Sequence, residues 1–238
     1  MLKRYSLVLA LSLALIPACA LGAPWLPLTA GMRWEYRGAN GQHQIETITG
    51  FTTLHGRVVA VKSYAEGADA GLQNYWFLAP DGSVMLAGFL NPSASLAWVY
   101  EPPVRYLPVP PVVGPGPEVL TSVHDLFTDA LLFQTSMRFD VTEQVTLAVP
   151  AGSFPTFGVG RLVNLPGPGT APQFALTMDG RALAPPTPGI FYIQSTDWFS
   201  EGVGVVQYQS FELLQLVGFG SPVPVAHSSW ARVKRLYH

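Results

Sequence analysis

The stretch VTLAVPAGSFPTFGVG, from Val145 to Gly160, decides the fold prediction because it reads as a strand, a tight turn and a second strand without a break. Val145, Leu147 and Val149 alternate with other residues, and this period of two is typical of a half-buried strand. Gly152 then provides the backbone freedom that a sharp turn needs. The stretch predicts an antiparallel hairpin, and it contains no catalytic motif.

The first twenty residues have the layout of a secretory signal peptide. Two basic residues precede an uncharged apolar segment at 7–16, and small residues continue to Ala20. We expect cleavage after Ala20 and an exported mature chain that begins near Leu21, in the periplasm or outside the cell. The alternative is a lipoprotein in which Cys19 carries the lipid and anchors the chain to a membrane. The apolar segment is too short to span a bilayer, so no transmembrane segment is expected after signal removal.

The composition of the remaining chain limits its partners. Cleavage after Ala20 leaves 218 of the 238 residues as one β-rich domain, 21–238, and removes the only cysteine, so no disulfide is expected. The formal charge moves from −2 to −4, and only 12% of the residues are charged, which excludes nucleic acid as a partner. The 22 prolines and 23 glycines disfavour long helices.

An early hairpin is predicted around Asn40-Gly41, the dipeptide that best suits a two-residue type I′ turn. Apolar and charged residues alternate before this turn, as in a strand with one buried face. We interpret the charged face as solvated, and the alternative is a carboxylate pair for acid/base chemistry. The cross-strand pairs that this turn predicts are Tyr36 with Ile45, Trp34 with Thr47, and Glu35 with Glu46.

Proline and glycine indicate where two later segments turn or become irregular. Pro80-Asp81-Gly82 predicts a second hairpin, since proline suits a type I turn and glycine the left-handed position that follows it. The segment 102–117 is dense in proline, which lacks the amide hydrogen that a ladder needs. We therefore predict a connector or an edge there.

One helix is predicted over residues 122–134. Ser122 can cap its first turn, where Asp125 also suits the helix dipole. Apolar residues then recur at the spacing of an amphipathic helix. The residues of this expected apolar face are Val123, Leu126, Phe127, Ala130 and Leu131.

Together these elements predict a mostly β fold, a single curved antiparallel sheet that forms an open half-barrel with one short helix. Short motifs recur along the chain and suggest two pseudo-repeats, at about 26–100 and about 107–217. The spacing between matching motifs grows along the chain, which would require insertions. Chance similarity between short β motifs is the alternative.

No catalytic or cofactor motif is present in the sequence. It lacks the metalloprotease helix motif, the nucleophile elbow, the phosphate loop and the dinucleotide fingerprint. His124, Asp125 and Asp129 are candidate metal ligands on the predicted helix, but we interpret them as its solvated face. We expect no metal, no cofactor and no enzymatic activity.

The aromatic residues say more about a possible binding site than the candidate metal ligands do. Six of them fall in predicted strands or at strand ends, where they form either a packed core or the lining of an apolar ligand cavity on the concave face. Trp76 and Trp198 precede glycine turns at matching places in the two pseudo-repeats, which predicts a shared concave face. The candidate ligand-binding residues are Trp34, Tyr36, Trp76, Phe77, Trp198 and Phe199.

The chain resembles a group of bacterial exported proteins of unknown function. The motifs that carry the resemblance are Gly-x-x-Trp-x-Tyr at 31–36, Val-Pro-Ala-Gly-x-Phe at 149–154 and Trp-Phe-x-x-Gly-Val-Gly at 198–204. The group is similar in architecture to the Lol-type lipoprotein carriers, whose curved sheet is covered by helical segments. The resemblance implies a place in the cell envelope and the handling of lipid or acyl chains.

These observations lead to three hypotheses about function. The first is an exported binding or carrier protein of the cell envelope for an apolar or lipid-like ligand. The second is a structural or protein-interaction module of the envelope with a protein partner. The third is a hydrolase without a recognisable motif. An apolar cavity and an apolar interface have the same composition, so the sequence does not separate the first two.

Overall fold

The computed structural model describes residues 23–67, 69–164, 175–176, 182–183, 191–209 and 213–221. The predicted signal peptide and Cys19 lie outside the described residues. Within these ranges, no helix is long and apolar enough to cross a membrane.

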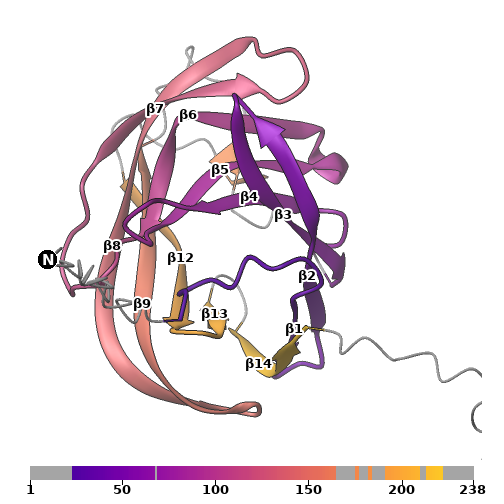
Figure 1. The fold of residues 1–238 in the computed structure, drawn as a ribbon, viewed down its shortest axis with the longest axis vertical. Coiled ribbons are helices and arrows are strands. Elements are labelled where there is room, and N and C mark those ends of the chain that lie inside the picture. Colours follow the sequence, from indigo (N-terminus) through magenta and orange to yellow (C-terminus); the bar gives the residue numbers. More distant parts are fainter. Residues whose placement is uncertain are drawn as a thin grey trace, which may run out of the picture.

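Nearly every described element is a β-strand, as the sequence predicts (Figure 1). The exception is a single turn of 3-10 helix, η1, at Pro92–Ala94. Two short strands, β10 (Ala175–Leu176) and β11 (Ala182–Leu183), form a separate two-stranded sheet. The strands of the main sheet are β1 (Arg33–Gly38), β2 (His43–Leu54), β3 (Arg57–Glu66), β4 (Gln73–Leu78), β5 (Val84–Asn91), β6 (Leu96–Leu107), β7 (Val119–Asp125), β8 (Leu131–Val149), β9 (Gly152–Asn164), β12 (Phe191–Ser200), β13 (Gly204–Gln209) and β14 (Leu213–Gly220).

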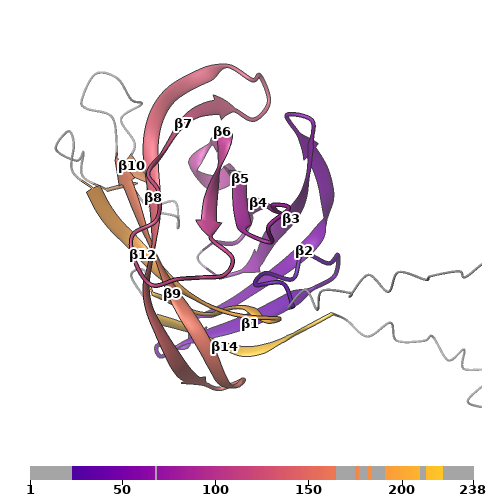
Figure 2. The ribbon, with the colours of Figure 1, turned by 60° about the vertical axis from the view of Figure 1, so that its left-hand side comes forward.

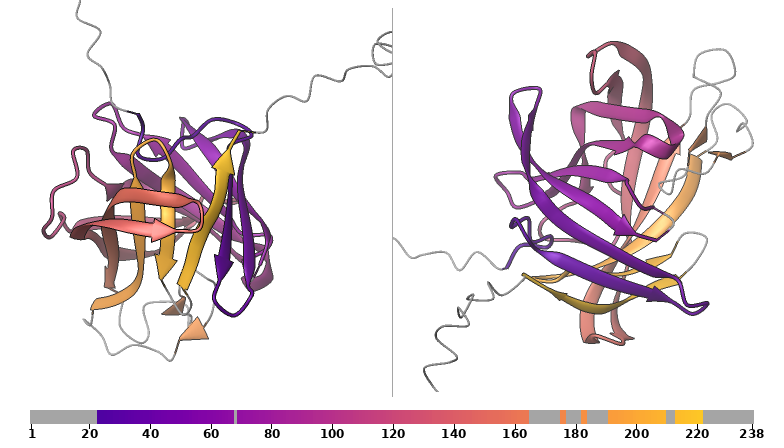
Figure 3. Two further views of the ribbon diagram at one scale, coloured as in Figure 1. Left: turned by 90° about the horizontal axis from the view of Figure 1, so that it is seen from below. Right: turned by 90° about the vertical axis from the view of Figure 1, so that its right-hand side faces the viewer.

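The main sheet is a closed barrel, so the prediction of an open half-barrel is wrong. Its strands pair antiparallel with their neighbours along the chain, and β1 then pairs with β14 (Figure 3). Trp34 lies opposite Phe219 and Arg37 opposite Gln215 in this last pairing. Closure satisfies the backbone donors and acceptors that two open edges would leave unpaired, and short-range sequence patterns carry no signal for it.

The predicted helix at 122–134 is also wrong, because the chain there forms the β7–β8 hairpin, which arches over one end of the molecule (Figure 2). Val123 is fully buried, whereas Phe127 and Leu131 are exposed, so the residues with helical spacing do not share a buried face. Asp125 does cap a turn: its carboxylate accepts hydrogen bonds from the amides of Phe127 and Thr128 at 3.0 and 2.8 Å. An Asx turn therefore takes the place of a helix cap.

The register of the β1–β2 hairpin differs by one residue from the prediction. Its loop is four residues long, 39–42, and the amide of Gly38 donates to the carbonyl of Gln42. Trp34 consequently pairs with Glu46, and Glu35 pairs with Ile45. Because side chains alternate across a strand, this shift moves Glu46 from the predicted solvated face to the inside of the barrel.

Two other predicted hairpins are confirmed. β8 and β9 pair from Val149 with Gly152 onward, around the Pro-Ala turn, and β4 and β5 are joined by the Pro-Asp-Gly turn. The proline-rich passage is only partly a connector, because its first residues belong to β6, which has a partner on each side. The β5–β6 pairing passes from Val99 to Val104, so Pro102 and Pro103 are not required to donate a backbone hydrogen bond to β5.

The barrel interior is the main hydrophobic core. Side chains from almost every strand meet there, and the largest fully buried ones include Trp34, Tyr36, Tyr106 and Phe199. A smaller cluster outside the barrel joins Val59, Tyr75 and Ala87 to other residues, including Leu126 of the β7–β8 turn. The core therefore combines aromatic side chains with a larger number of aliphatic ones.

We expect Gly88→Ala to lower the free energy of unfolding by about 1–3 kcal/mol or more, measured by urea denaturation. A Cβ at this position would lie 2.2 Å from the carbonyl oxygen of Trp98 on the adjacent strand, so β5 and β6 would have to separate. Gly218→Ala is the control, because its Cβ would meet nothing within 4 Å. Equal losses in the two variants would contradict the close approach of β5 to β6.

Candidate functional site

A buried ion pair lies inside the barrel where β2, β3 and β13 come together. Lys62 Nζ is 2.6 Å from Glu46 Oε2, and their side chains are only 3% and 0% exposed. Tyr208 accepts a hydrogen bond from Lys62 at 3.0 Å and donates one to Glu46 Oε2 at 2.8 Å. Gln44 donates to the other carboxylate oxygen at 2.6 Å. We call Gln44, Glu46, Lys62 and Tyr208 the polar centre.

Aromatic rings surround the charge of the polar centre. The Lys62 ammonium lies 5.6, 5.5 and 5.7 Å from the ring centroids of Trp34, Tyr64 and Tyr208. These rings stabilise a cation through their electron-rich faces, but removing two charges from water costs several kcal/mol per ion. A pair of apolar side chains of the same volume would fill the interior at a lower cost in desolvation free energy. Stability alone therefore does not account for the buried charges, and the polar centre is a candidate functional site.

A second buried acid, Asp197, lies beside the polar centre. It is the cross-strand neighbour of Tyr208, and it accepts a hydrogen bond from the hydroxyl of Tyr106. Burial raises the pKa of Asp197 to about 6, against the hydrogen bond from Tyr106 and the charges of Lys62 and Arg161, which lower it. Burial also raises the pKa of the Tyr106 and Tyr208 hydroxyls well above their ordinary value.

Asp197 should make the stability of the protein depend on pH. Because its pKa is raised, Asp197 keeps its proton in the folded chain at pH values where the unfolded chain, above about pH 4, has released it. This extra bound proton favours the folded state, and the contribution is lost as the pH rises through about 6. We expect the free energy of unfolding of the wild type, relative to Asp197→Asn, to fall by about 2–3 kcal/mol between about pH 4 and pH 7. Urea denaturation at several pH values measures this difference. A difference independent of pH would contradict the raised pKa.

A small cavity adjoins the polar centre and Asp197. Its volume is about 10 Å³, room for about one water molecule. The indole Nε1 of Trp76, one of the lining residues, has no hydrogen-bond partner among the described residues. The lining residues are Leu26, Lys62, Tyr64, Trp76, Asp197, Phe199, Val205 and Tyr208.

The six candidate aromatic residues do not share one face of the sheet. Trp34, Tyr36, Trp76 and Phe199 belong to the core inside the barrel. Phe77 lies on the outer face, with Arg57 over its ring at 4.6 Å.

Trp198 also points outward, between the inward-facing Asp197 and Phe199, and its indole donates to Glu143 at 2.8 Å. The predicted shared face of Trp76 and Trp198 is therefore wrong. Alternation along each strand sends adjacent residues to opposite sides.

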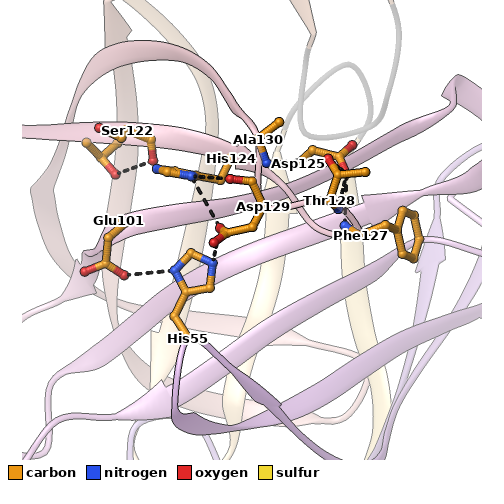
Figure 4. A network of polar contacts seen from close by, with 10 residues as sticks. His55, Glu101, Ser122, His124, Asp125, Phe127, Thr128, Asp129 and Ala130 are labelled. Carbon is orange, nitrogen blue, oxygen red and sulfur yellow. Dashed lines mark hydrogen bonds and ion pairs between the residues drawn. The ribbon is translucent and has the colours of Figure 1, made fainter.

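A network of polar contacts joins the β2–β3 turn to the β7–β8 turn (Figure 4). The ring nitrogens of His55 lie 2.9 Å from Asp129 Oδ1 and 3.4 Å from Glu101 Oε2, and His124 Nδ1 lies 3.0 Å from the main-chain oxygen of Asp129. We call His55, Glu101, His124 and Asp129 the histidine network. Within the part of the chain that the structure describes, no three or more histidine, cysteine, aspartate or glutamate side chains are grouped so that they could hold a metal ion.

The sequence prediction missed the residues of the polar centre. Lys62 follows the apolar run 58–61 of β3 and has the same strand parity as Ala60 and Tyr64, so a charge at this position could have drawn attention. Glu46 was placed on the wrong face by the register, and Tyr208 reaches it from 162 positions away along the chain. No local pattern indicates contacts over such a distance.

Comparison with known proteins gives little beyond these observations. No protein-family profile and no curated protein matches the chain. Two solved structures are similar: a candidate lipoprotein from Parabacteroides distasonis, at 14% identity and a TM-score of 0.41, and a candidate exported protein with a YmcC-like fold from Bacteroides fragilis, at 13% and 0.44. The matches cover 84% and 83% of this chain and 99% of each of the other two. Likenesses this weak carry no argument about function.

Proposed function

We propose that the protein is an exported, non-enzymatic module of the cell envelope that binds a partner protein through the end where the β2–β3 and β7–β8 hairpins meet. The observation that carries this proposal is a group of large apolar side chains exposed on these two hairpins. Phe127 is 76% exposed, and Leu131 is 58% exposed. The other members are Phe51, Val58, Leu120 and Leu132. We call these six residues the hairpin surface; it takes in both faces of the β7–β8 hairpin, because Leu131 and Leu132 are adjacent in β8.

The two hairpins are held together by the histidine network. His55 lies in the turn of one hairpin and Asp129 in the turn of the other, and both residues have a positive φ, of 46° and 61°. Such backbone conformations cost energy in residues other than glycine, and they persist where surrounding contacts impose them. Large apolar groups on a constrained surface are typical of an interaction site.

The charges around the hairpin surface favour a protein over a membrane as the partner. Glu101, Asp125 and Asp129 carry carboxylates beside it and outnumber Arg57, the one arginine described there, and the chain without residues 1–20 has a formal charge of −4. Anionic lipid surfaces attract basic segments and repel acidic ones. A protein surface with apolar residues and basic residues around them would complement this end of the molecule.

The experiment is native mass spectrometry of the protein purified from its own host. We expect a partner chain that is retained by the wild type and by Val112→Ser/Val113→Ser, which changes exposed apolar residues of the proline-rich connector. Phe127→Ser/Leu131→Ser should lose the partner while keeping the circular dichroism of the wild type. The proposal would be overturned if the two double variants retained the partner chain equally well. It would also be overturned if the protein bound anionic vesicles and this binding required Phe127 and Leu131.

A carrier of an apolar ligand is the second candidate function, and the observation that favours it is the cavity beside the polar centre. Trp76 lines this cavity and its Nε1 has no hydrogen-bond partner among the described residues, and Leu26, from the segment before β1, forms part of the wall. A ligand with an acyl chain would have to displace Leu26, because the cavity holds only about one water molecule. We expect a carrier to change its tryptophan fluorescence when a long-chain fatty acid is added, and unchanged fluorescence would count against it.

A further inference from the structure

The polar centre places an amine and a carboxyl group in contact in a dry environment. Lys62 Nζ and Glu46 Oε2 are 2.6 Å apart, and the two residues belong to neighbouring strands, β3 and β2. Aromatic rings surround the Lys62 ammonium, and the burial of both side chains excludes bulk water. Two reacting groups held together in this way behave as if they were present at very high concentration.

We propose that Lys62 and Glu46 condense into an amide bond, which crosslinks β2 to β3 inside the barrel. An exported chain whose only cysteine is expected to leave with the signal peptide has no disulfide to stabilise it. An amide between two side chains would take that role without a cysteine or an oxidant. This inference is independent of the partner-binding function proposed above.

The reaction needs only the groups that are present. A proton passes from the Lys62 ammonium to Glu46 Oε2, which replaces two buried charges by a neutral amine and a neutral acid. The nitrogen lone pair then forms a bond to Cδ of Glu46, and the bond from Cδ to one oxygen breaks. The nitrogen releases one proton, the departing hydroxyl takes one up, and the products are one amide and one water. No atom changes its oxidation state.

We assign the proton transfer of the last step to Asp197. It lines the same cavity as Lys62 and Tyr208, and its carboxyl group is buried. In its protonated form it can donate to the departing hydroxyl and then recover a proton from the nitrogen, so it acts as a general acid and base. The cavity has room for about one water molecule, the size of the product, and it reaches the reacting pair through Lys62, because Glu46 is not one of its lining residues.

Intact-mass spectrometry of the purified mature protein tests the proposal. We expect a mass lower by one water than the mass that its own N-terminus and sequence require. Digestion with trypsin after denaturation should give peptide 38–57 joined to peptide 58–105, with no cleavage after Lys62. The full mass, together with separate peptides 38–57, 58–62 and 63–105, would overturn the proposal and leave the pair as an ion pair.

Two variants separate this bond from other ways of losing water. Lys62→Arg keeps the positive charge but should have the full mass, and loss of water in this variant would place the reaction elsewhere and overturn the proposal. Asp197→Asn should give a mixture of joined and separate peptides, whereas complete joining would overturn the role of Asp197. Circular dichroism establishes that each variant folds. If neither variant folds, the peptide map of the wild type still shows whether Lys62 and Glu46 are joined.

Discussion

Trp76→Ala lowers the free energy of unfolding by about 3–5 kcal/mol, the loss typical of truncating a large aromatic residue in a core. Trp76 is 4% exposed and packs edge to face on Tyr106, with ring centroids 5.1 Å apart. The closed barrel around the indole limits how far the surrounding side chains can move into the space that it leaves. Chemical denaturation followed by circular dichroism measures the loss without relying on tryptophan fluorescence.

Phe77→Ala is the matched control for this expectation. It truncates the next residue of the same strand, but Phe77 lies on the outer face and is only half-buried. We expect a clearly smaller loss, because less apolar surface leaves contact with the protein. A loss as large as that of Trp76→Ala would contradict the assignment of the barrel interior as the main core.

Relative to a wild-type chain in which Lys62 and Glu46 form the ion pair, Lys62→Met lowers the free energy of unfolding by about 3–5 kcal/mol, because it leaves a buried carboxylate without its counter-ion. A wild-type chain that carries the amide would lose the crosslink in addition. Glu46 is fully buried, and the ammonium of Lys62 is the cation that it contacts in the ion pair at 2.6 Å. Hydrogen bonds from Gln44 and Tyr208 remain, but they do not replace a full positive charge. Urea denaturation at neutral pH measures the effect.

The double variant Lys62→Met/Glu46→Gln is the control for the buried charge. It removes both charges and keeps an amide that can accept from Gln44 and bond to Tyr208. We expect it to be more stable than Lys62→Met alone, since breaking a buried pair costs more than removing it. If the double variant is the less stable of the two, the cost does not come from an unpaired charge.

Local chemistry in the sequence was sufficient to predict the strands and several of their turns. The alternation around Val145 and the Pro-Asp-Gly turn at 80–82 each led to a hairpin that the structure confirms. Such signals depend on residues a few positions apart, where backbone preferences and side-chain alternation act directly. The same locality explains the wrong helix: Val123 and Leu126 have helical spacing, but strand pairing prevails over that weak preference.

The face on which a side chain lies, and therefore the candidate site, was decided only by the tertiary structure. A four-residue loop in place of a two-residue one turned Glu46 inward, although the residues of the loop themselves were correctly read as a turn. Pairing of β1 with β14 then closed the sheet and brought β13, with Tyr208, to Glu46 and Lys62. By itself the sequence determined that the chain forms a β-sheet with particular turns, because those preferences are local. Closure depends on contacts between residues more than 150 positions apart, as between Glu46 and Tyr208, and the register of the first hairpin depends on which loop the folded chain adopts, so only the folded chain sets them.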